Sequence, residues 1–234
     1  CVTDLLKSAF PVTLSLAIGA FLLWLFVGVS LGIVAARFKN RWPDRASNVF
    51  VLVGTSLPTF ISGILILLFV ALKFNLINPL EMGRWVSPLE DPVAWFRSFI
   101  FPWITLALLY AAGYTRFTRS SVIEISSEDY IRTARAKGLN ERDILRKHTL
   151  RAALAPIVTL AGLDFAGLLG GAIITEGIFN LPGLGRLSIR AVLNDYDLPT
   201  ILATTILAAS FVVIANLLVD ILYAYIDPRV RVAS

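Results

Sequence analysis

The chain alternates between nearly continuous apolar runs and short polar segments. A run of about 20 apolar residues is long enough to cross the hydrocarbon core of a bilayer as an α-helix. A soluble helix of that length carries a polar stripe, and these runs carry none. The pattern therefore predicts an all-α integral membrane protein with five transmembrane helices, at residues 10–36, 49–72, 99–118, 154–177 and 201–226.

Prolines fall within the first two of these predicted helices. Pro11 lies near the start of the first, where a missing N–H group is tolerated. Pro58 lies inside the second, and a proline there is expected to kink the helix.

Two further segments are too polar to cross a membrane. Residues 73–98 mix Pro, Gly, Trp and charges of both signs, which predicts an irregular outer loop. Residues 178–200 contain an LPGLG turn followed by an amphipathic run, which predicts a short helix at, or dipping into, the outer interface. Residues 1–234 are thus expected to form a single membrane domain.

Composition agrees with a membrane protein, since 57% of the residues are hydrophobic and 16% are charged, against about 25% charged in ordinary globular chains. Most of the 21 Lys and Arg residues lie in segments 37–48 and 116–151 and in the C-terminal tail. Basic residues concentrate on the cytoplasmic side, so the net charge of +5 reports orientation rather than nucleic-acid binding. We expect the N-terminus outside, the C-terminus inside, and a sixth, N-terminal helix ahead of residue 1.

The most highly charged segment, residues 128–150, reads EDYIRTARAKGLNERDILRKHTL. It predicts two short helices: Ser126 or Ser127 is expected to cap the first, and Gly138 to end it in a left-handed conformation. Asn140 is expected to cap the second. These signals indicate a helix–turn–helix elbow over residues 124–151 on the cytoplasmic surface.

The simpler interpretation is a solvated basic loop that obeys the positive-inside rule and attracts anionic lipid. A plain loop, however, needs neither paired caps nor the small residues Ala134, Ala136 and Gly138. Small residues let another surface approach a helix closely.

The elbow resembles the cytoplasmic coupling loop of ABC importer permeases. In that family the pattern is Glu-Ala-Ala, three residues, Gly, nine residues, then Ile-x-Leu-Pro, and here Ala134, Gly138 and Leu150 match it. The sequence DYIRTARAKGL at 129–139 more closely resembles the dipeptide/oligopeptide branch of the family, which departs from the general pattern in the same way.

Three more segments carry the same resemblance, so that it covers roughly residues 100–231. They are YTRFTRSSVIE at 114–124, ITEGIFNLPGLGRL at 174–187 and VDILYAYIDPRVR at 219–231.

The resemblance implies that the elbow inserts into a groove on a separate ATPase subunit. Ala134 and Gly138 would allow close approach, and Ile144 with Leu145 would form an apolar anchor. The implied ATPase contacts are Tyr130, Arg132, Thr133, Ala134, Arg135, Lys137, Gly138, Leu139, Ile144 and Leu145.

The resemblance also implies the partners. These are a second, homologous permease subunit, two ATPase subunits or domains that bind ATP and magnesium, an extracytoplasmic substrate-binding protein and membrane lipid. No cofactor is expected in this chain, and the location is a bacterial or archaeal cytoplasmic membrane.

Three carboxylates lie in or at the edges of the apolar runs, where a charge costs about 2.5–3.5 kcal/mol on insertion scales and is by default functional. Asp164 is expected either to face the translocation pathway or to make an interhelical hydrogen bond. Glu176 is expected to pin the LPGLG turn, and Asp220 to pair with a basic residue.

Two pairs of glycines, Gly28 with Gly32 and Gly167 with Gly171, have the small-xxx-small spacing that lets helices pack closely in lipid. They would pack helices within this chain or against a second permease subunit. Chance in a run rich in Ala and Gly remains the alternative.

Catalytic motifs are missing. No glycine is followed by lysine, so the chain has no phosphate-binding loop of the Gly-x-x-x-x-Gly-Lys type. One histidine and one cysteine cannot supply a zinc site, and we predict no metal site and no enzyme activity.

The function predicted is the membrane pathway of an ATP-driven importer of short peptides, with nickel chelates, glutathione and other peptide-like cargo left open. The alternative is a proton-driven transporter that uses Asp164, Glu176 and Asp220.

Overall fold

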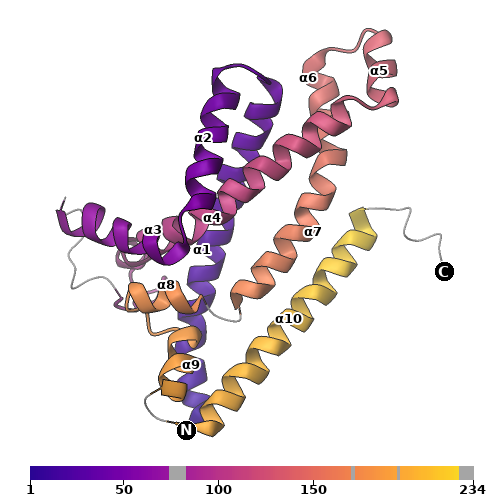
Figure 1. Cartoon of the computed structure of the whole chain (residues 1–234). Helices are drawn as coiled ribbons and strands as arrows, with labels where there is room; N and C mark the ends of the chain where they lie inside the picture. Colours follow the sequence, from indigo (N-terminus) through magenta and orange to yellow (C-terminus); the bar gives the residue numbers. More distant parts are fainter. Residues whose placement is uncertain (74–82, 170–171, 194–195, 227–234) are drawn as a thin grey trace. The chain divides into compact units, whose positions relative to one another are not determined.

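The computed structural model describes residues 1–73, 83–169, 172–193 and 196–226 (Figure 1). Within those ranges the regular structure is helical throughout, and no strand is present. The helices are α1 (Val2–Arg37), α2 (Trp42–Ser56), α3 (Thr59–Leu65), the wide π-helix η1 (Ile66–Lys73), α4 (Pro92–Ser126), α5 (Asp129–Ala136), α6 (Glu141–Asp143), the π-helix η2 (Ile144–Thr149), α7 (Leu150–Leu169), α8 (Ile173–Ile178), α9 (Leu184–Leu193) and α10 (Leu198–Ile226).

Four helical stretches in the described part are long and apolar enough to cross a membrane: Val2–Arg37, Pro92–Ser126, Glu141–Leu169 and Leu198–Leu218. Trp42–Ser56 with Thr59–Phe69 forms a fifth span if this bent pair counts as one. The prediction of an all-α membrane protein with five spans is confirmed in this form.

The second span is broken rather than merely kinked. Pro58 has φ −55° and ψ 144°, an extended conformation, and it precedes the first residue of α3. Proline also disfavours helical geometry at Leu57, the residue before it. The helix of α2 therefore stops, and α3 starts anew with Ile61 N–H donating to the Pro58 carbonyl oxygen at 3.0 Å.

Two predicted boundaries were wrong. The apolar run 154–177 is not one helix, because α7 ends at Leu169 and α8 begins at Ile173, beyond a glycine pair outside the described residues. The expected outer loop 73–98 is shorter, because α4 begins at Pro92. Asp91 caps that helix by accepting hydrogen bonds from the N–H groups of Val93 and Ala94, both at 3.0 Å.

The chain divides into two compact units. The first comprises Cys1–Leu23, Leu57–Leu109 and Leu163–Leu217, and the second Trp24–Ser56, Tyr110–Gly162 and Leu218–Ser234.

Aromatic side chains of α4 pack against α1 in the first unit. The Trp103 indole donates from Nε1 to the Ser15 carbonyl oxygen at 3.0 Å, which ties α4 to α1. Its ring lies directly against Gly19, where a Cβ atom would overlap it. Trp95 meets Trp103 edge to face with ring centroids 5.0 Å apart.

In the second unit, glycines let α1 and α4 pack closely. A Cβ atom on Gly28 would lie 2.7 Å from the Tyr114 Cβ, and one on Gly32 would lie 2.8 Å from the Thr115 carbonyl oxygen. Any larger residue would force the two helices apart. The structure thus places Gly28 and Gly32 at the contact between α1 and α4.

A buried ion pair holds α2 to α4 in the second unit. Arg119 donates from Nε and Nη2 to the two carboxylate oxygens of Asp44, at 2.6 and 2.9 Å. The Asp44 side chain is 4% exposed and also accepts from Asn40 N–H at 2.8 Å. The acid is thus fully paired in the first turn of α2, and Asn40 ties it to the segment that joins α1 to α2.

Replacing Asp44 should destabilise the second unit, because Arg119 would lose its counter-ion in a site largely closed to water. We expect Asp44→Asn to lower the thermal midpoint by several degrees. A double-mutant cycle with Arg119→Gln should give a coupling of about 1–3 kcal/mol.

The matched control is Asp143→Asn. Asp143 forms an exposed ion pair with Lys147, with Oδ1 and Nζ 3.8 Å apart. The substitution should leave the midpoint nearly unchanged. Equal effects at both sites would contradict a special role for the buried pair.

Candidate functional site

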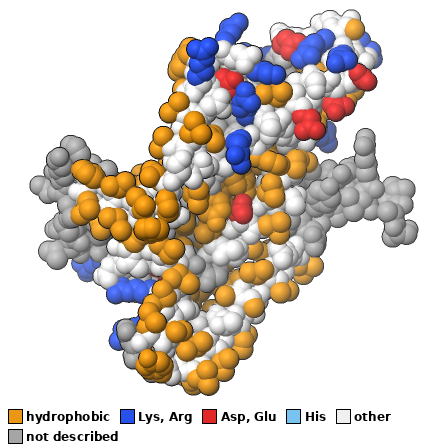
Figure 2. All heavy atoms as spheres, in the orientation of Figure 1, with side chains coloured by type: hydrophobic (Ala, Val, Ile, Leu, Met, Phe, Trp, Pro, Cys, Tyr) orange, Lys and Arg blue, Asp and Glu red, His pale blue; other side chains and the backbone are white. Residues whose placement is uncertain are grey.

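The elbow lies in the second unit, between α4 and α7 (Figure 1). Charged side chains gather over it in the space-filling view (Figure 2). Below it, Ser121 of α4 donates to the Ala153 carbonyl oxygen of α7 at 3.1 Å, so the two flanking helices are themselves connected.

The turn between its helices has the geometry expected from the sequence. Gly138 has φ +78°, and its N–H donates to the Arg135 carbonyl oxygen at 2.9 Å. Leu139 N–H donates to Ala134 at 3.4 Å, which completes a Schellman motif. Asn140 then caps the next helix, accepting from Arg142 N–H at 3.1 Å.

The predicted cap of the first helix was wrong. Glu128 precedes α5, and it makes no capping bond with its side chain. The helix of α4 continues to Ser126, so Ser126 and Ser127 donate back to the carbonyl oxygens of Val122 and Glu124, both at 2.6 Å. A serine hydroxyl bonded back into the preceding helix is no longer an acceptor placed at the next one.

Two predicted ATPase contacts face inward instead. Ile131, Ala134 and Ile144 form a small apolar core between the two arms of the elbow, and they are 0%, 9% and 1% exposed. Ile144 and Ala134 therefore hold the elbow together and offer no surface in this conformation. The i, i+3 spacing of Ile131 and Ala134 is the sequence signal that could have shown this.

Arg135 joins three parts of the elbow. Its Nε donates to Glu141 Oε1 at 2.6 Å, and its Nη1 donates to the Ser126 carbonyl oxygen at 3.3 Å. The end of α4, the helix α5 and the start of α6 are thereby connected through one guanidinium. This side chain also serves to fix the shape of the elbow.

The outward surface of the elbow is mixed. Tyr130 and Leu139 are 47% and 45% exposed. Leu145 is partly buried and lines a pocket of about 220 Å³ at the base of the elbow. The other exposed predicted contacts are Arg132, Thr133, Arg135, Lys137 and Gly138.

A second group of predicted residues lies around Glu176, in the first unit. The carboxylate is fully buried, accepts from Thr13 Oγ1 at 2.7 Å, and accepts from Arg186 N–H at 2.9 Å. Thr13 Oγ1 in turn accepts from Leu184 N–H at 2.8 Å. Glu176 and Thr13 together therefore satisfy the first N–H groups of α9, which have no partner within the helix.

The glycines of the LPGLG turn make room for this carboxylate. A Cβ atom on Gly183 would lie 2.5 Å from Glu176 Oε1, and one on Gly185 would lie 3.0 Å from Oε2. Burial raises the pKa of Glu176, while the hydrogen bonds from Thr13 and from the backbone of α9 lower it. The structure places Glu176 at the turn that it was expected to pin.

Asp164 and Gly167 lie in α7, apart from the residues of the elbow and of the Glu176 turn named above. Asp164 is partly buried in α7, and Gly167 is exposed, with open space where a Cβ atom would lie. Packing of Gly167 inside this chain is thus not seen, and Gly171 and the side chain of Asp220 lie outside the described residues. Among the described residues, no three His, Cys, Asp or Glu side chains gather closely enough to hold a metal ion.

Removing the Glu176 side chain should destabilise the first unit. Glu176→Ala leaves the N–H of Arg186 and the hydroxyl of Thr13 without an acceptor in a buried site, so we expect a loss of about 2 kcal/mol or more. The readout is the thermal midpoint of the purified protein in mild detergent.

The matched control is Glu176→Gln. Its amide oxygen can accept from Arg186 N–H, and its NH₂ group can donate to Thr13 Oγ1, so most of the network should survive. If the Gln variant proves as unstable as the Ala variant, the negative charge rather than the hydrogen-bond network is the stabilising feature.

Comparison with known proteins identifies relatives of this chain. The chain is 40% identical over 231 residues to the glutathione transport system permease protein GsiC of Escherichia coli (strain K12), covering 98% of this chain and 71% of that protein. It is 39% identical over 230 residues to a putative peptide transport system permease protein of Brucella abortus (strain 2308), covering 98% and 72%.

Solved structures share the fold at low sequence identity. Inward-facing conformations of the MetNI methionine ABC transporter superpose with a TM-score of 0.73 at 17% identity, covering 96% of this chain and 97% of that one. An amino acid ABC transporter with histidines gives a TM-score of 0.63 at 18% identity, covering 97% and 94%.

The family model for the "binding-protein-dependent transport system inner membrane component" matches residues 28–232. This match covers most of the chain, including the elbow and the Glu176 turn. The chain belongs to this family, the membrane permease subunits of ABC importers.

Proposed function

We propose that this chain forms the translocation pathway of an ATP-driven importer for short peptides or peptide-like compounds such as glutathione. The support is its identity of about 40% to permeases named for glutathione and peptide transport, which extends over nearly the whole chain. Which of these compounds is carried depends on side chains along the pathway and on the binding protein that delivers the cargo.

The elbow is the part of the chain that we propose contacts the ATPase subunits. A lever must keep its shape to transmit motion, and the elbow is held by a buried apolar core, a Schellman turn and the Arg135 bridge. Tyr130 and Leu139 then supply exposed apolar contacts, and Arg132 and Lys137 supply polar ones. In this proposal, closure of the ATPases biases the membrane helices between inward- and outward-open states.

The proposed assembly contains a second, homologous permease, two ATPase subunits or domains, and an extracytoplasmic binding protein. ATP and magnesium bind to the ATPases, so catalysis lies outside this chain. The excess of basic residues in segments 37–48 and 116–151 supports a cytoplasmic elbow, an outer N-terminus and an inner C-terminus. The basic residues of the tail lie outside the described residues.

A proton-driven transporter is not favoured by any observation. Among the carboxylates considered for it, Glu176 is engaged with Thr13 and the backbone of α9. A group held in this way is suited to fixing a helix rather than to exchanging protons with a pathway.

The experiment is co-purification of the whole importer from cells that express all of its subunits. Tyr130→Ala combined with Leu139→Ala should reduce recovery of the ATPase subunits about tenfold, because two exposed apolar contacts are lost. The matched control is Leu89→Ala, which truncates a side chain that is 95% exposed in the first unit and should change nothing.

Recovery of the second permease with every variant shows that the chain has folded. Full recovery of the ATPases with the double variant would place their contact elsewhere. Absence of ATPase from all preparations would reject the importer itself.

Gly138 offers a test of the shape of the elbow. Open space surrounds the position of its Cβ, so a larger side chain meets no clash, and the restriction comes from its positive φ alone. We expect Gly138→Asn, which tolerates this conformation, to keep near-normal transport. Gly138→Val, which does not, should reduce cargo-stimulated ATP hydrolysis severalfold, measured with the importer in liposomes.

A further inference from the structure

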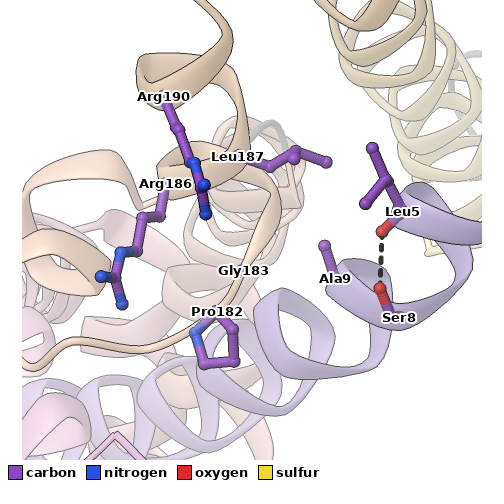
Figure 3. A pocket seen from close by; sticks show the side chains of 8 residues that line it. All are labelled: Leu5, Ser8, Ala9, Pro182, Gly183, Arg186, Leu187 and Arg190. Carbon is purple, nitrogen blue, oxygen red and sulfur yellow. Dashed lines mark hydrogen bonds between the residues drawn. The ribbon is translucent and has the colours of Figure 1, made fainter. Parts of the chain in front are cut away.

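A pocket of about 270 Å³ in the first unit lies between the first turns of α1 and the turn that leads into α9 (Figure 3). Arg186 and Arg190 come from successive turns of α9, and Leu187 points from the same helix toward Leu5 of α1 (Figure 3). The pocket thus has a cationic part and an apolar part. The other lining residues are Ser8, Ala9, Pro182 and Gly183.

The walls of the pocket are fixed by contacts described above. Glu176 holds the backbone of Arg186, and Thr13 holds that of Leu184, so the start of α9 is tied to α8 and α1. The Arg186 side chain donates from Nη1 to the Asn180 carbonyl oxygen at 2.9 Å. A site formed in this way is largely preorganised for a ligand.

The sequence of α1 places the pocket at a membrane–water boundary. Its first turns contain the polar residues Asp4, Lys7 and Ser8, and the chain becomes almost wholly apolar from Ala9 onward. At 36 residues this helix is about 54 Å long, well beyond the roughly 30 Å of hydrocarbon that it has to cross. The helix therefore extends beyond the hydrocarbon core, and its polar first turns are the end that we place in the headgroup region.

The helix α9 has the character of an interfacial helix. It is 10 residues long, too short to span, and it carries its two arginines together with exposed apolar side chains. Val192 is 46% exposed and Leu193 is 65% exposed. Cationic and apolar groups on one short helix suit a position among lipid headgroups.

The charge of the pocket selects an anion. Of the described residues that line it, two carry a positive charge and none carries a carboxylate. A guanidinium has five N–H donors and binds phosphate oxygens in pairs, so a contact made by one of its nitrogens leaves others for a ligand. We propose that the pocket binds the phosphate of an anionic phospholipid, with the glycerol and upper acyl carbons against Leu5 and Leu187.

This proposal does not depend on the cargo or on ATPase coupling, so its test is separate from that of the proposed function. The complete importer, purified in mild detergent with phosphatidylglycerol, is analysed by native mass spectrometry for retained phospholipid. The unmodified protein should keep the lipid. Arg190→Gln, which leaves the bond between Arg186 and Asn180 in place, should lower its retention severalfold, and Arg186→Gln with Arg190→Gln about tenfold or more.

The matched control is Arg97→Gln, which removes an exposed arginine of α4 in the same unit but outside the pocket. It should retain lipid like the unmodified protein, and a thermal midpoint for each variant separates loss of binding from loss of folding.

Any of four results would overturn the proposal; the first three concern the lipid itself. They are absence of retained phospholipid in the unmodified protein, equal retention by the pocket variants and the Arg97 control, or displacement of the lipid by millimolar inorganic phosphate, which would mark a site for free phosphate. A fourth is loss of binding-protein docking in the pocket variants with lipid retention unchanged, which would assign the arginines to an acidic protein surface.

Discussion

An apolar environment leaves a polar group two choices, a partner within the protein or a position at the membrane edge. The structure meets this constraint at two buried carboxylates. Asp44 is paired with Arg119 at the start of α2, and Glu176 is surrounded by the N–H groups of α9 and the hydroxyl of Thr13. Because each carboxylate is fully partnered, it can connect segments that apolar packing alone would leave free to slide.

The two carboxylates work in different ways. Asp44 meets a guanidinium, so charge is balanced by charge, whereas Glu176 meets mainly backbone donors at a helix end. The second arrangement needs space more than charge, which is why glycine stands at positions 183 and 185. The glycines of the LPGLG turn and the Glu176 carboxylate are thus two parts of one site.

Much of this architecture follows from local sequence. Run length predicted the spans, and Gly138 with Asn140 predicted the turn of the elbow. Pro58 predicted a kink at the position where the structure has a full break. The rest depends on partners distant in the chain. Arg119 lies 75 residues from Asp44, and a single sequence contains nothing that pairs them. Ala134 and Ile144 are a different case: they were expected on the outer surface, although the i, i+3 spacing of Ile131 and Ala134 equally fits a core between the two arms.

The elbow and the Glu176 turn must also form at different times. The Arg135 bonds join residues six and nine positions apart, and loops of about 10 residues close in well under a microsecond, while synthesis adds about 5–20 residues per second. The elbow can therefore fold as it leaves the ribosome, before α7 is complete. The bond between Thr13 and Glu176 spans 163 residues and has to wait for most of the chain. A nascent permease would thus have its elbow formed well before the bond between Thr13 and Glu176 can close.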